Sequence, residues 1–335
     1  MLETSPSNRF FALQEPVLRD LLFASIGTRF DEQPVTSPSQ GVNNNTFLVG
    51  SAGTGGVVLK LRPISSHAAP VDSPYWPDFT RALWGEKANG DIRSLGQVSE
   101  LLQTHGKVRV PKILHISHTL EHVPAPFTIT EMLQGVPFDW NAHPVDNLGA
   151  EQLGRHLGSL HRDVPGAGFG IFEGPLDPGS DWWPRFSLAY TMLAQRLAAM
   201  STVVAQSAER LLAVLDRAIG TGTPDHFGLI CIDQAPTHYL RDSGGGIGAM
   251  VDIEGHLWAP VEYELAMMSL WMPDFDAFQR AYSSEYSWPV AFAEAAAAYR
   301  VFTWMQWIYC MRVLTPDRAA AESLESRITD DFLVG

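Results

Sequence analysis

Three charged residues occur where the surrounding sequence is apolar. Lys60 lies inside the run VVLKL, Asp233 follows FGLICI, and Asp252 follows GAMV. Burying a charged side chain is unfavourable unless it has a partner, so these positions are candidates for chemistry. A lysine on a strand, an aspartate in a loop and a second aspartate at a cation site are what transfer of a nucleotide's terminal phosphoryl group to a hydroxyl requires. The competing interpretation of Lys60 is a half-exposed strand that presents it, with Arg62, to solvent.

The two aspartates also have plainer interpretations. Asp233 can serve a turn, and the acids of VDIEG can lie on an edge strand in water. Glu254 stands two residues after Asp252, however, and residues two apart on a strand share one face. Both carboxylates are therefore predicted to point at one cation. Each motif is weak alone, and the prediction depends on their combination.

The elements that must position these residues begin with a small sheet-rich lobe. Residues 1–30 predict a short amphipathic helix. The runs TFLVGS and VVLKLRP, joined by a glycine-rich turn at 53–56, predict a hairpin. A helix over 80–105 and strands at VRVPKILHIS and PFTITEML complete a first lobe over residues 1–133.

Beyond Gly135 the pattern becomes helical, which predicts a larger lobe over 134–335. Helices are predicted there over 151–164, 182–200 and 202–219. A strand pair, FGLICI and HYLRD, leads through a glycine turn to GAMVDIE. The tripeptide His-Arg-Asp at 161–163 ends a helix, and basic residues near a helix C-terminus explain it better than catalysis does. The aromatic segment 288–307 is predicted to be mainly core.

Composition limits the function classes. The 335 residues include 37 acidic and 23 basic side chains, a net charge of −14, which argues against nucleic-acid binding and mildly favours cationic small molecules. Two cysteines cannot form a disulfide framework. The sequence shows neither a secretory signal pattern nor eighteen consecutive apolar residues. We therefore expect a cytoplasmic protein with no membrane or nucleic-acid partner.

The motifs together resemble those of the aminoglycoside phosphotransferase and choline kinase-like superfamily, which has the bilobal protein-kinase-like fold. The family's lysine strand, its HGD-x-x-x-x-N loop and its IDWE segment have counterparts in VVLKL, CIDQAPTH and VDIEGHLWAPVEYELA. RVPKILHIS, ITEMLQGVPF and LGRHLGSLHRDV also match, so the resemblance spans about residues 35–270. It implies an α+β fold in which a small antiparallel-sheet lobe precedes a mainly helical one.

The resemblance also implies a role for each matching position. Asp233 would be the catalytic residue, Asp252 would bind Mg²⁺, and Lys60 would contact the α- and β-phosphates of ATP or GTP. Further nucleotide contacts would come from Asn44, Asn45, Glu131, Met132 and Leu133. The lysine's usual partner in the family is a helix glutamate. Glu86 and Glu100 are the candidates for it, and Glu100 is preferred.

Three positions depart from the family's motif. Cys231 and Ile232 replace the histidine and glycine of HGD, and His238 replaces the asparagine that binds Mg²⁺. A histidine at this position resembles the branch that includes macrolide phosphotransferases. A neutral imidazole can bind a cation, although Mg²⁺ prefers oxygen. His238 is therefore assigned, with Asp252, to the metal site.

The implied function is that of a small-molecule kinase. Its acceptor would be a hydroxyl-bearing molecule, preferably cationic, such as an aminoglycoside- or macrolide-like antibiotic. Two alternatives stay open. The departures at Cys231, Ile232 and His238 suit a catalytically degenerate kinase-like protein that binds a ligand or partner. A metabolic kinase of the same fold would act on a sugar, a choline-like compound or an amino acid.

Overall fold

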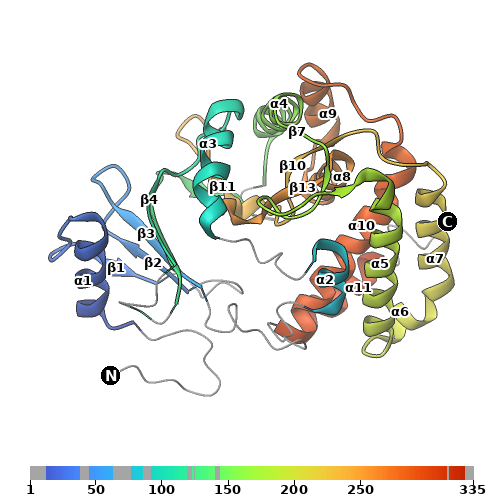
Figure 1. The fold of residues 1–335 in the computed structure, drawn as a ribbon, viewed down its shortest axis with the longest axis horizontal. Helices are drawn as coiled ribbons and strands as arrows, with labels where there is room; N and C mark the ends of the chain where they lie inside the picture. The colour runs from blue at the N-terminus through green and yellow to red at the C-terminus, as the bar shows by residue number, and fades with distance from the viewer. Residues whose placement is uncertain are drawn as a thin grey trace.

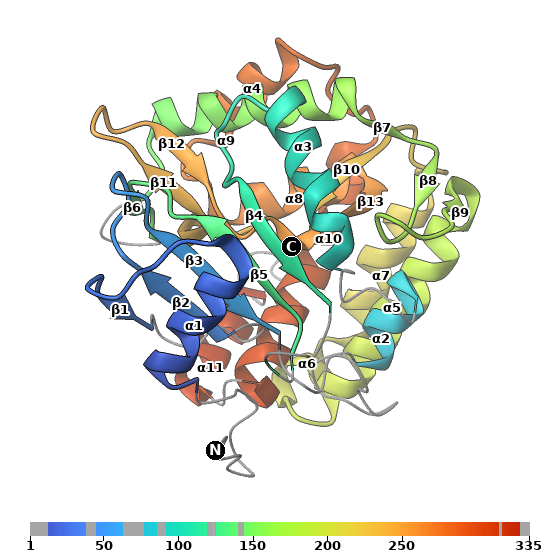
Figure 2. The same cartoon turned by 60° about the vertical axis from the view of Figure 1, so that its left-hand side comes forward.

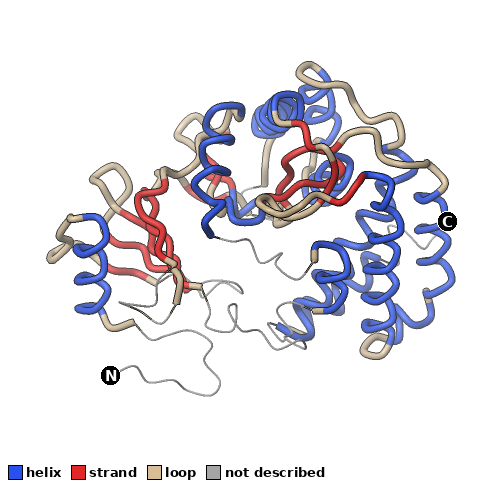
Figure 3. Tube along the Cα trace, in the orientation of Figure 1, coloured by secondary structure: helices blue, strands red, loops and turns tan. Residues whose placement is uncertain are grey.

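The chain forms an N-terminal antiparallel sheet followed by a larger part in which helices predominate (Figure 1). Figure 3 shows the strands of the first part grouped on the left, most of the helices in the centre and on the right, and further strands between them. The α+β fold predicted from the sequence is confirmed. The computed structural model describes residues 13–37, 45–62, 77–85, 92–118, 123, 125–139, 144–314 and 317–328.

The N-terminal sheet has five antiparallel strands in the order β1-β2-β3-β5-β4. They are β1 (Val35–Thr36), β2 (Asn45–Val49), β3 (Val57–Leu61), β4 (Ile113–Ser117) and β5 (Phe127–Glu131). The hairpin predicted for β2 and β3 is confirmed, and its turn places Gly53 and Gly55 at φ of 86° and 81°. Glycine adopts these angles without steric cost. Lys60 therefore lies in a central strand, between β2 and β5.

Three helices accompany this sheet in the sequence. They are α1 (Glu15–Ile26), α2 (Asp78–Trp84) and α3 (Leu95–His105), with a 3₁₀ turn η2 (Ile92–Ser94) before α3. In α1, Leu18 and Leu22 are completely buried and pack with Leu59 of β3 in one apolar cluster. The single helix predicted over 80–105 is wrong. Gly85, at φ 84°, ends α2, and α2 packs against a helix of the second part (Figure 1).

The second part is built on long helices and short strands. Its helices are α4 (Asn147–Asp163), α5 (Trp182–Ala198), α6 (Thr202–Gln206), α7 (Ala208–Ile219), α8 (Val261–Trp271), α9 (Phe275–Ser283), α10 (Phe292–Tyr309) and α11 (Arg318–Ile328). Short helical turns are η3 (Gly179–Asp181), η4 (Pro236–His238), η5 (Ile253–Gly255) and the π-helical η6 (Cys310–Leu314). The helix predicted over 202–219 is divided at Ser207 into α6 and α7.

Aromatic side chains fill the space where α5, α8 and α10 meet. The ring of Phe186 lies 5.2 Å from that of Tyr299 and 5.0 Å from that of Phe302. Trp182 Nε1 donates to Tyr299 Oη at 2.9 Å, which satisfies the buried indole. The aromatic segment 288–307 is thus mainly core, as predicted. Among the helices of the described residues, none is both long enough and apolar enough to span a membrane.

Two small three-stranded sheets carry the loops that follow the apolar strands, and two further strands pair in a separate sheet. The strands are β6 (Val136–Pro137), β7 (Pro165–Gly166), β8 (Gly168–Phe169), β9 (Asp177–Pro178), β10 (Phe227–Cys231), β11 (Tyr239–Arg241), β12 (Ile247–Met250) and β13 (His256–Pro260). β10 pairs with β13 and β7, whereas β11 pairs with β12 and β6. The expected pairing of FGLICI with HYLRD is therefore wrong. Figure 2 shows both small sheets above the N-terminal sheet.

Helix α4 approaches α9 closely because two glycines of α4 face α9 at the contact. A Cβ at Gly154 would lie 2.3 Å from Phe278 O, and one at Gly158 would lie 2.8 Å from Tyr282 O. Real Cβ atoms do not approach so near, so larger residues here would push the two helices apart. The glycines of LGRHLGSLHRDV thereby bring the end of α4 next to Tyr282.

Candidate active site

The predicted site residues come from separate parts of the chain. Lys60 lies in β3, Asp233 follows β10, His238 ends η4, and Asp252 precedes η5. Although Lys60 and Asp252 are 192 positions apart, their side chains are in contact. The two halves of the fold thus meet at one cluster of charged groups.

Lys60 is held between two carboxylates. Its Nζ donates to Asp252 Oδ1 at 2.8 Å and to Glu254 Oε2 at 3.0 Å, and 16% of its side chain is exposed. Burial alone would lower the pKa of Lys60, but the charges of Glu254 and Asp252 raise it above its ordinary value. Lys60 is therefore a fixed cation, and the solvent-facing interpretation is contradicted.

The pKa values of the two carboxyl groups around Lys60 shift in opposite directions. Burial favours the neutral form of Asp252, but the charge of Lys60 and hydrogen bonds to the carboxylate bring its pKa below the ordinary value. Burial raises the pKa of Glu254, and the nearby charge of Asp252 adds to this effect, while Lys60 opposes it. Asp252 is thus the more readily ionised of the two.

The backbone at Asp252 is what aims both acids at Lys60. Its φ of 61° and ψ of 59° make it the one non-glycine residue with positive φ in the described part of the chain. Such a conformation costs about 1–3 kcal/mol and tends to persist at functional sites. β12 ends at Met250, so the expectation that Asp252 and Glu254 share a strand face is wrong. A left-handed residue followed by the turn η5 produces the convergence instead.

His238 faces Asp252 with one ring nitrogen. Its Nδ1 lies 2.8 Å from the backbone oxygen of Asp233, and because a carbonyl oxygen only accepts, Nδ1 carries the proton. In the neutral ring Nε2 then presents its lone pair, 3.8 Å from Asp252 Oδ2. Two electron-pair donors that face each other across this gap suit a bound cation.

The loop that carries Asp233 is hydrogen-bonded to the turn η5, which follows Asp252. Ile232 N donates to Gly255 O at 3.0 Å, and a Cβ at Gly255 would lie 3.1 Å from Asp233 Cβ, so glycine leaves room for this approach. The Asp233 side chain is open to solvent, although protein atoms surround it on most sides. That burial raises the pKa of Asp233, and the charge of Asp252 raises it further. The charge of Lys60, and that of His238 when its ring is protonated, lower it.

A buried glutamate anchors the same loop from beneath. Glu264 Oε1 accepts from Cys231 N at 2.8 Å and from Gln234 Nε2 at 2.6 Å, and its Oε2 lies 2.9 Å from His161 Nε2. Burial raises the pKa of Glu264, but the hydrogen bonds from His161 and Cys231 reverse the effect and lower it. The other nitrogen of His161 bonds Tyr282 Oη at 2.9 Å. His161 lies in the last turn of α4, as predicted, and its side chain also anchors Glu264, which the sequence did not reveal.

Sequence reasoning did not assign Glu264 and Gln234 to the site. A signal for Glu264 existed, because it is an acid in a helix, α8, that is otherwise buried and apolar almost all round. Such a helix belongs to a core, where a carboxylate needs hydrogen-bond donors.

Replacing Glu264 by alanine is expected to destabilise the protein by about 3–5 kcal/mol, because it leaves His161 and the two loop donors without their buried acceptor. Glu264→Gln is expected to lose much less, since an amide oxygen can still accept from Cys231 N. Urea denaturation measures both values. Glu151→Ala, which removes an exposed ion pair with Arg155, is the control. Equal stability of the Glu264→Ala and control variants would show that this anchor is dispensable.

At the end of β5, some of the backbone groups predicted to contact a nucleotide already make hydrogen bonds within the protein. Glu131 N donates to Lys112 O and Met132 N donates to Gly56 O. Leu133 is buried, and its N–H makes no hydrogen bond within the described part of the chain. The Glu131 carboxylate is also engaged, with Lys112 N and Arg109 Nη2.

The remaining nucleotide candidates divide into three cases. Asn45 is buried at the start of β2, opposite Leu61, so its side chain lies on the other face of the sheet from that of Lys60. Asn44 and Glu86 lie outside the described residues. Glu100 is exposed on α3, and the acids that contact Lys60 are Asp252 and Glu254. The preferred pairing of Lys60 with Glu100 is therefore wrong for this structure, because the buried side of α3 is apolar or small.

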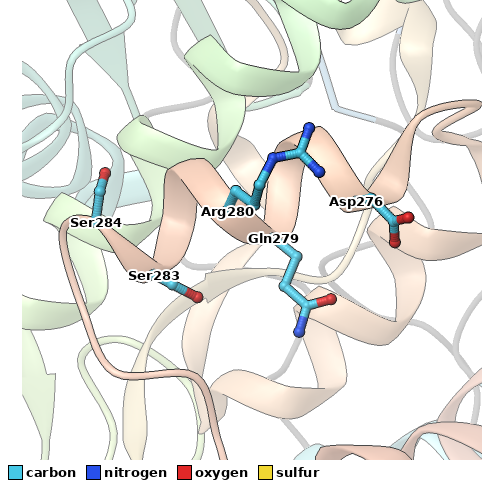
Figure 4. Close-up of a pocket in the computed structure, with 5 residues that line it drawn as sticks. All are labelled: Asp276, Gln279, Arg280, Ser283 and Ser284. Carbon is cyan, nitrogen blue, oxygen red and sulfur yellow. The ribbon is translucent and has the colours of Figure 1, made fainter.

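Two hollows described on the surface lie away from this cluster. One of about 530 Å³ lies along α9 and is lined by five residues (Figure 4): Asp276, Gln279, Arg280, Ser283 and Ser284. Another of about 310 Å³ lies beside the Glu131 carboxylate and basic residues at 107–112. No group of three or more metal-ligating side chains occurs in the described ranges. Mg²⁺ does not require one, because it is commonly held by one or two carboxylates together with phosphates.

The sequence of this chain matches a known protein family. The family described as Phosphotransferase enzyme family, APH, matches residues 34–299, while no curated protein sequence matches the chain.

Solved structures match over nearly the whole length. Macrolide 2'-phosphotransferase MphH from Brachybacterium faecium has 17% identity and a TM-score of 0.60, over 92% of this chain and 96% of that one. A thermostable mutant of aminoglycoside phosphotransferase APH(4)-Ia, in a ternary complex with AMP-PNP and hygromycin B, has 16% identity and a TM-score of 0.61, over 95% and 98%. The GDP and kanamycin complex of APH(2")-IIia has 14% identity and a TM-score of 0.64, over 93% and 97%.

At these identities the solved structures establish the fold, and the family match adds the sequence relationship. That match includes Lys60, the loop of Asp233 and the turn of Asp252. The chain belongs to the phosphotransferase enzyme family APH.

Proposed function

We propose that this chain is a small-molecule kinase that transfers the γ-phosphoryl group of ATP or GTP to a hydroxyl group. The observation that carries the proposal is the meeting of Lys60, Asp252 and His238 beside the loop of Asp233. These groups supply a phosphate-binding cation, metal ligands and a hydroxyl-orienting aspartate. In this proposal residues 1–133 form the nucleotide lobe and residues 134–335 the lobe that holds the acceptor.

The nucleotide would bind between Lys60 and residues 131–133, which form the hinge segment between the two lobes. Relatives were solved with AMP-PNP and with GDP, which supports a nucleotide donor here. Lys60 would contact the α- and β-phosphates, with Asn44 and Asn45 beside them. At the hinge segment Glu131–Leu133, the N–H of Leu133 is the group left to meet the purine edge, because the N–H groups before it bond within the protein.

The donor set at Asp252 and His238 fits a divalent cation. Asp252 supplies a carboxylate that resists protonation, and the carbonyl of Asp233 fixes the His238 tautomer with its lone pair toward Asp252. These two residues would hold Mg²⁺, which would neutralise charge on the phosphates when bound. Asp233 would orient the acceptor hydroxyl and accept its proton.

An active enzyme is favoured over a degenerate binding protein by the way the loop is held. Its departures from the family motif affect side chains at Cys231 and Ile232, yet both backbone N–H groups have partners, Glu264 and Gly255 respectively. The loop geometry therefore does not depend on the missing histidine and glycine.

The acceptor class is inferred from what lies beside Asp233. Burial raises the pKa of the Cys310 thiol, at the start of η6, to about 11, and the charge of Asp233 contributes to this rise. Trp307, Met311 and Val313 are half-buried in this stretch. An apolar wall in a protein of net charge −14 suits a hydroxylated natural product with an apolar body and an amine, as in macrolides. Aminoglycosides are the second choice.

A panel of acceptors tests this function. The protein is incubated with γ-labelled ATP or GTP and Mg²⁺, and with a macrolide, an aminoglycoside, choline, a sugar or an amino acid. We expect label on the macrolide or the aminoglycoside, and none with the Asp233→Asn variant. Label on choline, the sugar or the amino acid alone would make this a metabolic kinase. Absence of both label transfer and nucleotide binding would support the degenerate protein instead.

A further inference from the structure

Lys60 has one more acidic partner than the cation site accounts for. Its Nζ contacts Asp252 and Glu254 at 2.8 and 3.0 Å. Asp252 also faces His238 across 3.8 Å, which places it at the proposed cation. Glu254 does not face His238 among the described contacts; besides Lys60, its carboxyl group shares a hydrogen bond with Asp252. Its side chain is 12% exposed, against 35% for Asp252. The two acids are therefore arranged with Asp252 toward the open side and Glu254 toward the interior.

Helix α3 offers Lys60 no acid of its own. The buried residues of this helix are Leu95, Val98, Ser99 and Leu102. Its one acidic residue, Glu100, is exposed. A helix that buries only apolar and small side chains cannot hold an ammonium group in place.

Binding of a cation would leave Lys60 in need of a second anion. The charge of Asp252 would then be shared between the metal and the lysine, and the ammonium group must still point at the phosphates. A buried carboxylate within 3.0 Å keeps that group in one position, because burial limits exchange with water. Glu254 meets this need without any movement of α3.

Backbone conformation and packing hold the segment that carries Glu254 in place. Asp252 takes the left-handed conformation, and the next residue, Ile253, is buried in the main apolar core. The turn η5 is further tied to the catalytic loop by the hydrogen bond from Ile232 N to Gly255 O. Glu254 thus projects from a segment that is anchored on both sides.

We propose that Glu254 is the positioning residue for Lys60, in the place that a helix glutamate would otherwise occupy; the inference rests on the proposed nucleotide-binding function. The position of the phosphate-binding lysine then depends on the loop that carries the metal ligand and not on α3. Glu254 acts through Lys60 and does not itself bind the cation.

A double-mutant cycle tests the proposal. Glu254→Gln, Lys60→Met and the double variant are titrated with AMP-PNP and GMP-PNP over a range of Mg²⁺ concentrations. Glu254→Gln is expected to weaken nucleotide binding by about 10–100-fold, the usual effect of losing a residue that orients a ligand-binding group. The Mg²⁺ concentration for half-maximal binding should stay within about twofold. In the Lys60→Met background the same change should add less than about twofold, because coupled residues are not additive.

Controls separate this role from a loss of folding. Glu254→Asp keeps a carboxylate and should recover part of the affinity, and thermal unfolding of every variant checks that the fold is intact. Glu151→Gln, at an exposed ion pair on α4, should bind nucleotide like the unaltered protein.

Three results would overturn the proposal. Additive effects with a raised Mg²⁺ requirement would make Glu254 a cation ligand. Coupling of Glu100→Gln, instead of Glu254→Gln, to Lys60→Met would restore the helix glutamate as partner. Failure of the unaltered protein to bind either nucleotide would remove the proposed function and this inference together, whereas the first two results leave the function standing.

Discussion

Asparagine in place of Asp233 is expected to reduce phosphoryl transfer by about 10²–10⁴-fold, the range for loss of a group that takes a proton in the transition state. Asparagine has nearly the same shape but cannot accept the proton of the attacking hydroxyl. Lys60 is bound to Asp252 and Glu254 and not to Asp233, so the affinity for AMP-PNP or GMP-PNP should change less than about twofold. Steady-state kinetics and calorimetric titration measure the two quantities.

The control for this substitution is Asp31→Asn, at an exposed aspartate beside Arg29. It should leave both transfer and binding unchanged. Full activity of Asp233→Asn would remove Asp233 from the mechanism. Loss of nucleotide binding in that variant would instead mean that the loop supports the nucleotide site.

Asparagine in place of Asp252 is expected to weaken Mg²⁺-dependent nucleotide binding by about 10²-fold, because it removes the one ionised ligand of the proposed cation site. Asparagine also adopts left-handed backbone angles readily, so the variant tests the charge and leaves the turn at φ 61° intact. Binding measured without Mg²⁺ should fall much less. Calorimetry at several Mg²⁺ concentrations distinguishes the two conditions.

The companion variants use His238, the other proposed ligand. His238→Ala should raise the Mg²⁺ requirement, while His238→Asn, which offers an oxygen that Mg²⁺ prefers, should retain more binding than the alanine variant. Equal Mg²⁺ dependence in the unaltered protein and in Asp252→Asn would contradict the cation site.

The sequence predicted the fold well and singled out Lys60 and Asp252 as site residues, because both positions stand out in local patterns. It did not predict that their side chains contact each other, since Glu100 was the preferred partner of Lys60. A lysine inside an apolar strand and an aspartate after another are readable in short windows, and the order of the motifs matches a known family. The hairpin of β2 and β3 was equally readable from its glycine turn.

What the sequence did not reveal depends on contacts between distant segments. His161 and Glu264 are 103 residues apart, and the packing of both α4 and α8 against β10 brings them together. The pairing of Glu254 with Lys60 depends on one left-handed residue. Aspartate adopts this conformation more often than most non-glycine residues do, but it remains uncommon, so the local sequence does not single out Asp252. The break after α2 was missed because Gly85 was included in a single helical pattern.

The central claim, that Lys60 and Asp252 form a Mg²⁺-dependent nucleotide site, is tested most directly by thermal unfolding of the unaltered protein with ATP or GTP, each with and without Mg²⁺. A ligand at a hundred times its dissociation constant adds about 2.7 kcal/mol of stability. We predict an upward shift of the unfolding midpoint with one of the two nucleotides that requires Mg²⁺. An unchanged midpoint with both nucleotides, or a shift that does not depend on Mg²⁺, would contradict the claim.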